Sequence, residues 1–140
     1  MADPPRGNGG VLVIDTELMF AQVVELALTR HGYAASVVDL SVTADPERLL
    51  RQMLAGPTDV LLLDLGLDLG RHGDGVAVIS WAVRAGVPVV VVKGSDSRED
   101  RARALEAGAR RMLTKTSSLA DLLDTVEQLL SEEQSLPAGT

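Results

Sequence analysis

The residues best suited to chemistry are two aspartates and a lysine, each of which directly follows an apolar run. Asp15 and Asp64 follow unbroken runs, and Lys115 follows a weaker one. Two carboxylates facing an ammonium group can hold Mg2+ beside an oxygen nucleophile and neutralise a phosphoryl group. In such a site Asp64 would be the nucleophile and would form an acyl phosphate. Lys93, at the end of another apolar run, is a further candidate.

These side chains can act together only if the runs before them end at one edge of a sheet. Unbroken apolar runs are typical of parallel strands that helices cover on both faces, and the carboxyl edge of such a sheet binds ligands. Strands are predicted at residues 11–14, 34–40, 60–63, 89–92 and 111–114. Helices are predicted at residues 17–30, 46–55, 74–85, 97–107 and 118–131. The alternation predicts an α/β fold: a (βα)5 doubly wound parallel five-stranded sheet in the flavodoxin-like order 2-1-3-4-5.

Capping residues and apolar stripes define the helices further. Asp45, Asp96 and Ser118 are predicted N-caps, and Asp74 opens the third helix. In the third helix Val83 is predicted to point inward. The apolar stripe predicted for the first helix consists of Leu18, Met19, Val23, Leu26 and Ala27.

Composition narrows the class of protein. The chain has 140 residues, no cysteine and a formal net charge of −7. This length suits one domain with its own core. The lack of cysteine excludes thiolate catalysis and zinc–thiolate sites, and the acidic balance argues against nucleic-acid binding by this segment.

The ends of the chain allow a prediction of domains and location. A flexible leader is predicted at 1–10, the folded domain at 11–131, and a polar tail or the start of a linker at 132–140. No stretch approaches a membrane-spanning apolar length, and the N-terminus lacks the pattern of a signal peptide. A cytoplasmic protein is therefore expected.

Several motifs, taken in order, resemble the receiver domain of two-component response regulators over residues 11–131. The resemblance rests on the acids after the first and third strands and the lysine after the fifth. Three shorter motifs add to it: Asp74-Gly75, Gly86-Val87-Pro88-Val89 and Ala107-Gly108-Ala109. The segment soon after the first acid is most similar to regulators with a C-terminal helix-turn-helix.

The resemblance implies a role for each site residue and a set of partners. Asp64 would be the phosphoacceptor, Lys115 would bind phosphate, and Asp15, Asp64 and the main chain of Gly66 would hold Mg2+. The implied partners are a sensor histidine kinase, a second copy bound through the fourth helix, fifth strand and fifth helix, and a C-terminal DNA-binding effector domain outside this chain. Such a domain is a signalling module that controls partner binding, not an enzyme.

Two departures from the receiver pattern affect the site. Receivers usually have a second acid directly after the first, where this chain has Thr16, and a small hydroxyl residue at the end of the fourth strand, where it has Lys93. Two carboxylates would then face Lys93 and Lys115, which makes the predicted pocket formally neutral. We therefore expect weakened Mg2+ binding and weakened phosphorylation.

Both departures allow a second interpretation. Lys93 either pairs with Asp64 as a cation that replaces the metal, or points to solvent. Glu17 or Asp68 would restore the missing acid.

Two other functions compete with a phosphorylated receiver. A constitutive pseudo-receiver, which binds a protein or ligand without phosphorylation, is favoured by Thr16 and Lys93. A haloacid-dehalogenase-like phosphatase also uses an aspartyl nucleophile, but it needs a second aspartate two residues later. This chain has Glu17 or Gly66 there, so the phosphatase ranks last.

Overall fold

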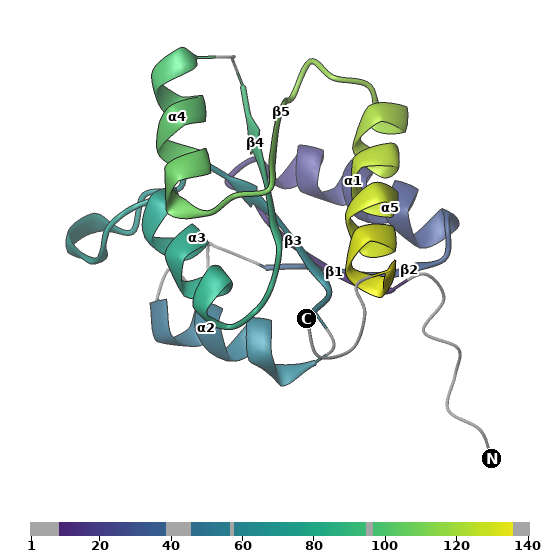
Figure 1. Cartoon of the computed structure of the whole chain (residues 1–140), viewed down its shortest axis with the longest axis horizontal. Coiled ribbons are helices and arrows are strands. Elements are labelled where there is room, and N and C mark those ends of the chain that lie inside the picture. The colour runs from purple at the N-terminus through teal and green to yellow at the C-terminus, as the bar shows by residue number, and fades with distance from the viewer. Residues whose placement is uncertain (1–8, 39–45, 57, 95–96, 136–140) are drawn as a thin grey trace.

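The computed structural model describes residues 9–38, 46–56, 58–94 and 97–135, which form a parallel five-stranded sheet with helices on both faces (Figure 1). The sheet order is β2-β1-β3-β4-β5, so the predicted α/β fold and strand order are confirmed. The strands are β1 (Gly9–Ile14), β2 (Tyr33–Val37), β3 (Val60–Asp64), β4 (Val89–Lys93) and β5 (Arg111–Thr114). The helices are α1 (Leu18–Arg30), α2 (Pro46–Ala55), α3 (Gly75–Arg84), α4 (Arg98–Ala107) and α5 (Leu119–Ser135).

The unbroken apolar runs reflect burial of the sheet on both faces. Along β3, Leu61 and Leu63 pack with residues of α2, α3 and α4, whereas Val60 and Leu62 pack with residues of α1 and α5. Figure 1 shows these two groups of helices on opposite sides of the sheet. Because successive side chains of a strand point to opposite faces, every position of a central strand must be apolar.

Side-chain caps fix the starts of three helices. Asp74 caps α3 and Ser118 caps α5, as predicted, and each accepts a hydrogen bond from a main-chain N–H of the first turn. The cap of α4 is Ser97 rather than Asp96: its hydroxyl accepts from the N–H three residues later, the usual capping geometry. Asp96 and Asp45 lie outside the described residues.

The apolar stripe predicted for α1 is wrong. The exposed residues include Leu18, Met19, Val23 and Leu26, and the buried ones are Ala21, Val24 and Leu28. Both sets recur at helical spacing, so periodicity alone could not distinguish the buried face from the exposed one. Val83 of α3 is likewise exposed, because the smaller Ala82 faces the sheet instead.

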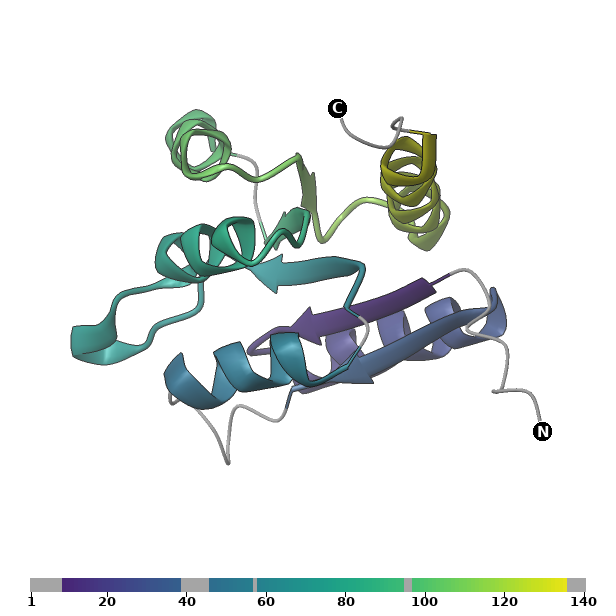
Figure 2. The ribbon, with the colours of Figure 1, turned by 60° about the horizontal axis from the view of Figure 1, so that its bottom comes forward.

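The loop at residues 65–74, between β3 and α3, folds back on itself. An isolated antiparallel bridge joins Asp68 to Asp74, and a short 3-10 helix, η1 (Gly70–His72), makes the turn. Leu67 and Leu69 are buried in the core, which anchors the loop directly after Asp64. Figure 2 shows the tip of the loop projecting away from the sheet.

Two boundaries bear on the predicted domains. β1 begins at Gly9, inside the predicted leader, and residues 1–8 lie outside the described part of the chain. α5 extends to Ser135, beyond the predicted end at residue 131.

Across the residues that the structure describes, no helix has the length and apolar character needed to cross a membrane.

Candidate functional site

Asp15, Asp64 and Lys115 meet at the carboxyl edge of the sheet. Asp15 follows β1, Asp64 ends β3, and Lys115 follows β5. The Lys115 Nζ lies 3.0 Å from Asp15 Oδ1 and 3.7 Å from Asp64 Oδ2. The fold thus brings together residues that are 49 to 100 positions apart in sequence. We call the group formed by Asp15, Glu17, Asp64 and Lys115 the acid–lysine cluster.

The Asp64 carboxylate is buried and held by hydrogen bonds to both oxygens. Its Oδ1 accepts from the Gly66 main-chain N–H at 2.9 Å, and its Oδ2 accepts from the Thr16 hydroxyl at 2.8 Å. The Thr16 N–H lies 3.5 Å from the same Oδ2. Only 6% of Asp64 is exposed, so the carboxylate has one fixed orientation at the sheet edge. The residue that replaces the second acid therefore contacts the candidate nucleophile directly.

The Asp15 carboxylate is buried beside Asp64. Its Oδ1 accepts from the Glu17 main-chain N–H at 2.7 Å as well as from Lys115. Burial raises the pKa of Asp15, and the negative charge of Asp64 adds to the rise, although the two hydrogen bonds oppose it. Because ionisation of this buried carboxyl group costs free energy, a bound cation would stabilise its charged form.

Glu17 completes the cluster from the solvent side. Its Oε1 lies 2.8 Å from the Lys115 Nζ, and its side chain is 65% exposed. Burial alone would lower the pKa of Lys115, but the hydrogen bonds to Glu17 and Asp15 outweigh burial, so the pKa is raised. The Lys115 Nζ also lies 4.9 Å from the centre of the Phe20 ring, a cation–π contact that no local sequence pattern indicates.

Lys93 does not form the predicted pair with Asp64. Its ammonium pairs with Asp100 of α4 instead. The physical reason is strand alternation: Val92 faces α1 and α5, so the next residue, Lys93, leaves the strand on the α4 side.

The charge of the site is therefore not the predicted zero. Three carboxylates and one ammonium make up the acid–lysine cluster, formally −2. Lys93 is absent from these contacts, and Glu17 supplies the third acid. Asp68, the other candidate acid, accepts a hydrogen bond from the Gly70 N–H in the loop at residues 65–74. Of the two candidate acids, Glu17 is thus the one that takes part in the cluster, although position 16 itself carries a threonine.

The donor set suits a divalent cation held largely by water. Asp15 and Asp64 offer two neighbouring carboxylates, and Mg2+ commonly uses one or two carboxylates while keeping several waters. Among the described residues, no group of three His, Cys, Asp or Glu side chains is arranged to hold a metal. The residues fit a Mg2+ site that water completes rather than an all-protein cage.

Comparison with known proteins decides the family. Residues 11–127 match the response regulator receiver domain. The chain belongs to this family. Receiver domains interact with histidine kinases and typically bind Mg2+ at the phosphorylation site.

Curated relatives are similar over most of this chain. The sensory transduction protein RegX3 of Mycobacterium tuberculosis is 33% identical over 120 residues, which are 86% of this chain and 50% of that protein. The transcriptional regulatory protein PrrA of the same organism is 32% identical over 123 residues, 86% of this chain and 49% of that protein. This receiver chain spans about half the length of the curated relatives it matches.

The receiver fold also has close structural counterparts. A CheY-like response regulator receiver domain protein from Methanospirillum hungatei superimposes with a TM-score of 0.74 at 23% identity. The match covers 90% of this chain and 96% of that one. This likeness confirms the flavodoxin-like fold.

Proposed function

We propose that this receiver accepts a phosphoryl group on Asp64 from a sensor histidine kinase and thereby controls partner binding. The supporting observation is the environment of Asp64. Its carboxylate is buried and oriented by two donors, and the Lys115 ammonium lies 3.7 Å away. A nucleophile at the sheet edge, with a cation positioned for developing negative charge, is the arrangement that phosphoryl transfer needs.

The transfer is a displacement at phosphorus. An Asp64 oxygen forms the new O–P bond while the P–N bond of a phosphohistidine breaks, and the imidazole nitrogen keeps the electron pair. Lys115 offsets the charge on the phosphoryl oxygens, and the Gly66 N–H and Thr16 hydroxyl keep the carboxylate in line. Asp15 and Asp64, with the main-chain carbonyl of Gly66, would hold Mg2+, which supplies further neutralisation of the phosphoryl charge.

We further propose that Mg2+ binds more weakly here than in receivers with a second acid. Thr16 adds no carboxylate, and its hydroxyl already donates to Asp64 Oδ2. The exposed Glu17 offers a partial substitute, but its carboxylate contacts Lys115. Lys93, predicted as a metal-replacing cation, contacts Asp100 and so is not proposed in that role.

Incubation with acetyl phosphate and Mg2+ tests the proposal. The intact mass of the chain should rise by one phosphoryl group, and hydroxylamine should remove it because an acyl phosphate is labile to that nucleophile. Asp64→Asn should abolish the modification, and Lys115→Ala should slow it. No mass increase at any Mg2+ concentration would overturn the proposal.

A pseudo-receiver is the second candidate. The observation in its favour is that each charged group of the acid–lysine cluster already has a partner without a phosphoryl group, because Lys115 contacts three carboxylates. If this function holds, Asp64→Asn leaves partner binding unchanged and beryllofluoride does not bind.

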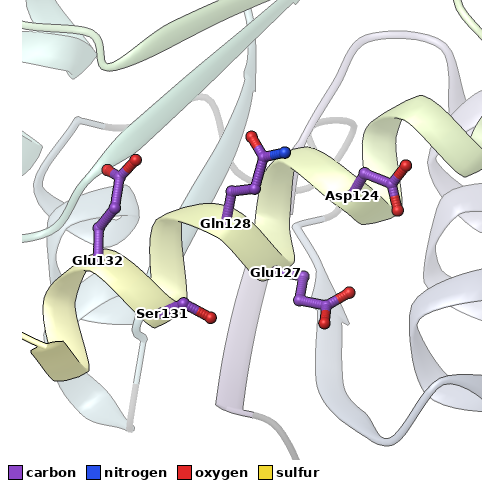
Figure 3. A pocket seen from close by; sticks show the side chains of 5 residues that line it. All are labelled: Asp124, Glu127, Gln128, Ser131 and Glu132. Atoms are coloured by element: carbon purple, nitrogen blue, oxygen red, sulfur yellow. The ribbon is translucent and has the colours of Figure 1, made fainter.

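We also propose a homodimer through α4, β5 and α5. Figure 3 shows the side chains along one side of α5, which line a pocket and include Asp124, Glu127 and Glu132. On β5, Arg111 already pairs with Glu132 within the chain at 2.9 Å. An acidic α5 beside arginines on α4 and β5 offers a surface that a second copy can match in charge.

Because the relatives are twice as long, we propose a DNA-binding effector domain beyond this segment.

A further inference from the structure

An ion pair between Lys93 and Asp100 links the end of β4 to α4. The side chains are only 29% and 17% exposed, respectively. The hydrogen bond from Lys93 is the largest cause of a lowered pKa at Asp100. Ala104 is the one buried residue of α4, so apolar packing contributes little to holding this helix. Polar contacts such as this ion pair are therefore important for the position of α4.

The link continues from α4 to the start of α3. Arg103 lies 3.8 Å from the other oxygen of Asp100 and donates to Asp74 Oδ2 at 3.0 Å. Asp74 is the cap of α3 and ends the loop that follows Asp64. We call these four residues, Lys93, Asp100, Arg103 and Asp74, the α4 network. It joins the two loops that leave β3 and β4 at the site.

Lys93 lies on the same edge of the sheet as Asp64. Asp64 is paired with Val92 in the β3–β4 register, and the Lys93 carbonyl accepts from the Lys115 N–H at 2.7 Å. Strand spacing and rise place the Lys93 and Asp64 Cα atoms roughly 6 Å apart. Lys93 leaves its strand on the α4 side, but its four-carbon stem is long enough to turn across the end of β4 toward Asp64. A Cβ built at Gly94 would have no described atom within 4 Å.

A phosphoryl group on Asp64 would compete with Asp100 for Lys93. It carries a charge of roughly −2, against −1 for the Asp100 carboxylate, and offers three acceptor oxygens. Lys115, the other nearby cation, is already shared among three carboxylates. Lys115 alone therefore cannot neutralise the phosphoryl group. The Lys93 ammonium carries three hydrogen-bond donors on a flexible stem and can supply the second positive charge.

We propose that Lys93 is a second cationic ligand of the phosphoryl group on Asp64 and that, by leaving Asp100, it releases α4. This inference rests on the proposed phosphorylation of Asp64. It assigns to Lys93 both stabilisation of the modified state and transmission of that state to α4.

The test uses the full chain with Mg2+ and beryllofluoride, a non-covalent phosphoryl mimic. Fluorine NMR reports whether the mimic binds, and hydrogen exchange reports protection of the amides of residues 98–107. In the unmodified sequence, beryllofluoride should speed amide exchange in α4 by about fivefold. This is the effect expected from the loss of one partly buried ion pair. In Lys93→Met, exchange in α4 should already be fast and should not change further.

Affinity for beryllofluoride provides the second readout. Asp100→Asn removes the competing anion and should tighten binding by about fivefold, whereas Lys93→Met should weaken it by a similar factor. In the double variant the Asp100→Asn gain should vanish, because there is no cation to release. Arg98→Gln, which removes a positive charge from the exposed side of the same helix, is the matched control and should change neither readout.

The outcomes separate this inference from the proposed function. If beryllofluoride binds but α4 exchange stays constant and Asp100→Asn does not tighten binding, Lys93 remains on Asp100 and the inference is wrong, while phosphorylation stands. If beryllofluoride binds to no variant, the proposed function fails and the inference fails with it.

Discussion

At position 16 a hydroxyl stands where a carboxylate would extend the metal site. Thr16→Asp adds an anionic oxygen ligand next to Asp64 and frees Asp64 Oδ2 from the threonine hydroxyl. We expect the Mg2+ dissociation constant, measured by isothermal titration calorimetry, to fall about tenfold, which corresponds to about 1.4 kcal/mol. Thr16→Val, which removes only the hydroxyl, is the control, and its Mg2+ affinity should rise much less. Equal affinities for the original and Thr16→Asp chains would contradict this view of the site.

Asp15 should make Mg2+ binding dependent on pH. Burial raises the pKa of its carboxyl above the usual value of 3.8, and Asp64 adds to the shift. Mg2+ needs the ionised form, so a proton competes with the cation as the pH falls through the raised pKa. The Mg2+ affinity should therefore begin to fall at a higher pH than an ordinary aspartate would cause.

Calorimetric titrations from neutral pH downward check this dependence, and carbon NMR of the carboxyl group measures the pKa of Asp15 directly. Saturating Mg2+ should lower that pKa. A pKa of Asp15 at or below 3.8 without Mg2+ would contradict the burial observed here.

At the residue scale, sequence reasoning located the cluster but not all of its contacts. The positions of Asp15, Asp64 and Lys115 after apolar runs were sufficient to place them at one edge. The partner of Lys93 was not predictable, because it depends on where α4 lies and on which face of β4 the lysine leaves. Glu17 appeared only as an alternative, since nothing in its local sequence fixes the direction of a mostly exposed side chain.

At the scale of elements, strands were easier to predict than helix faces. A central parallel strand is apolar on both faces, so its sequence signal does not depend on orientation. A helix such as α1 has apolar residues on two sides, and only the finished packing shows that Ala21, Val24 and Leu28 face the sheet. The predicted cap of α4 differs from the observed one by one residue, because neighbouring Asp and Ser residues can both act as N-cap.

The junction of β3 and α3 should be sensitive to small changes in volume. A Cβ built at Gly75 would lie 2.7 Å from the Leu65 carbonyl oxygen, one residue after Asp64. Gly75→Ala should therefore reduce the free energy of unfolding by about 2 kcal/mol, because main-chain atoms must move. Urea denaturation measures the loss.

Gly56→Ala is the control for that substitution. A Cβ at Gly56 would meet no described atom within 4 Å, so the change should stay within about 0.5 kcal/mol. If both variants unfold at the same urea concentration, the close approach of α3 to the loop after Asp64 is not a constraint.

For the whole molecule, the proposed dimer makes a prediction about association. Sedimentation velocity should show a monomer without beryllofluoride and a dimer with Mg2+ and beryllofluoride. Leu105→Asp places a charge on α4 at a residue that is 46% exposed, and should prevent the dimer. Leu54→Asp on α2, at a residue 61% exposed, is the control and should dimerise normally. A monomer under both conditions, or equal effects of the two substitutions, would contradict a dimer through α4, β5 and α5.

Locating the phosphoryl group tests phosphorylation of Asp64 most directly. After phosphotransfer from a phosphohistidine donor, borohydride reduction converts an aspartyl phosphate to homoserine, which peptide mass spectrometry can locate in the sequence. Phosphorylation of Asp64 predicts homoserine at position 64 alone, with the signal lost in Asp64→Asn. A label at any other residue, or none on a chain that remains folded, would contradict it.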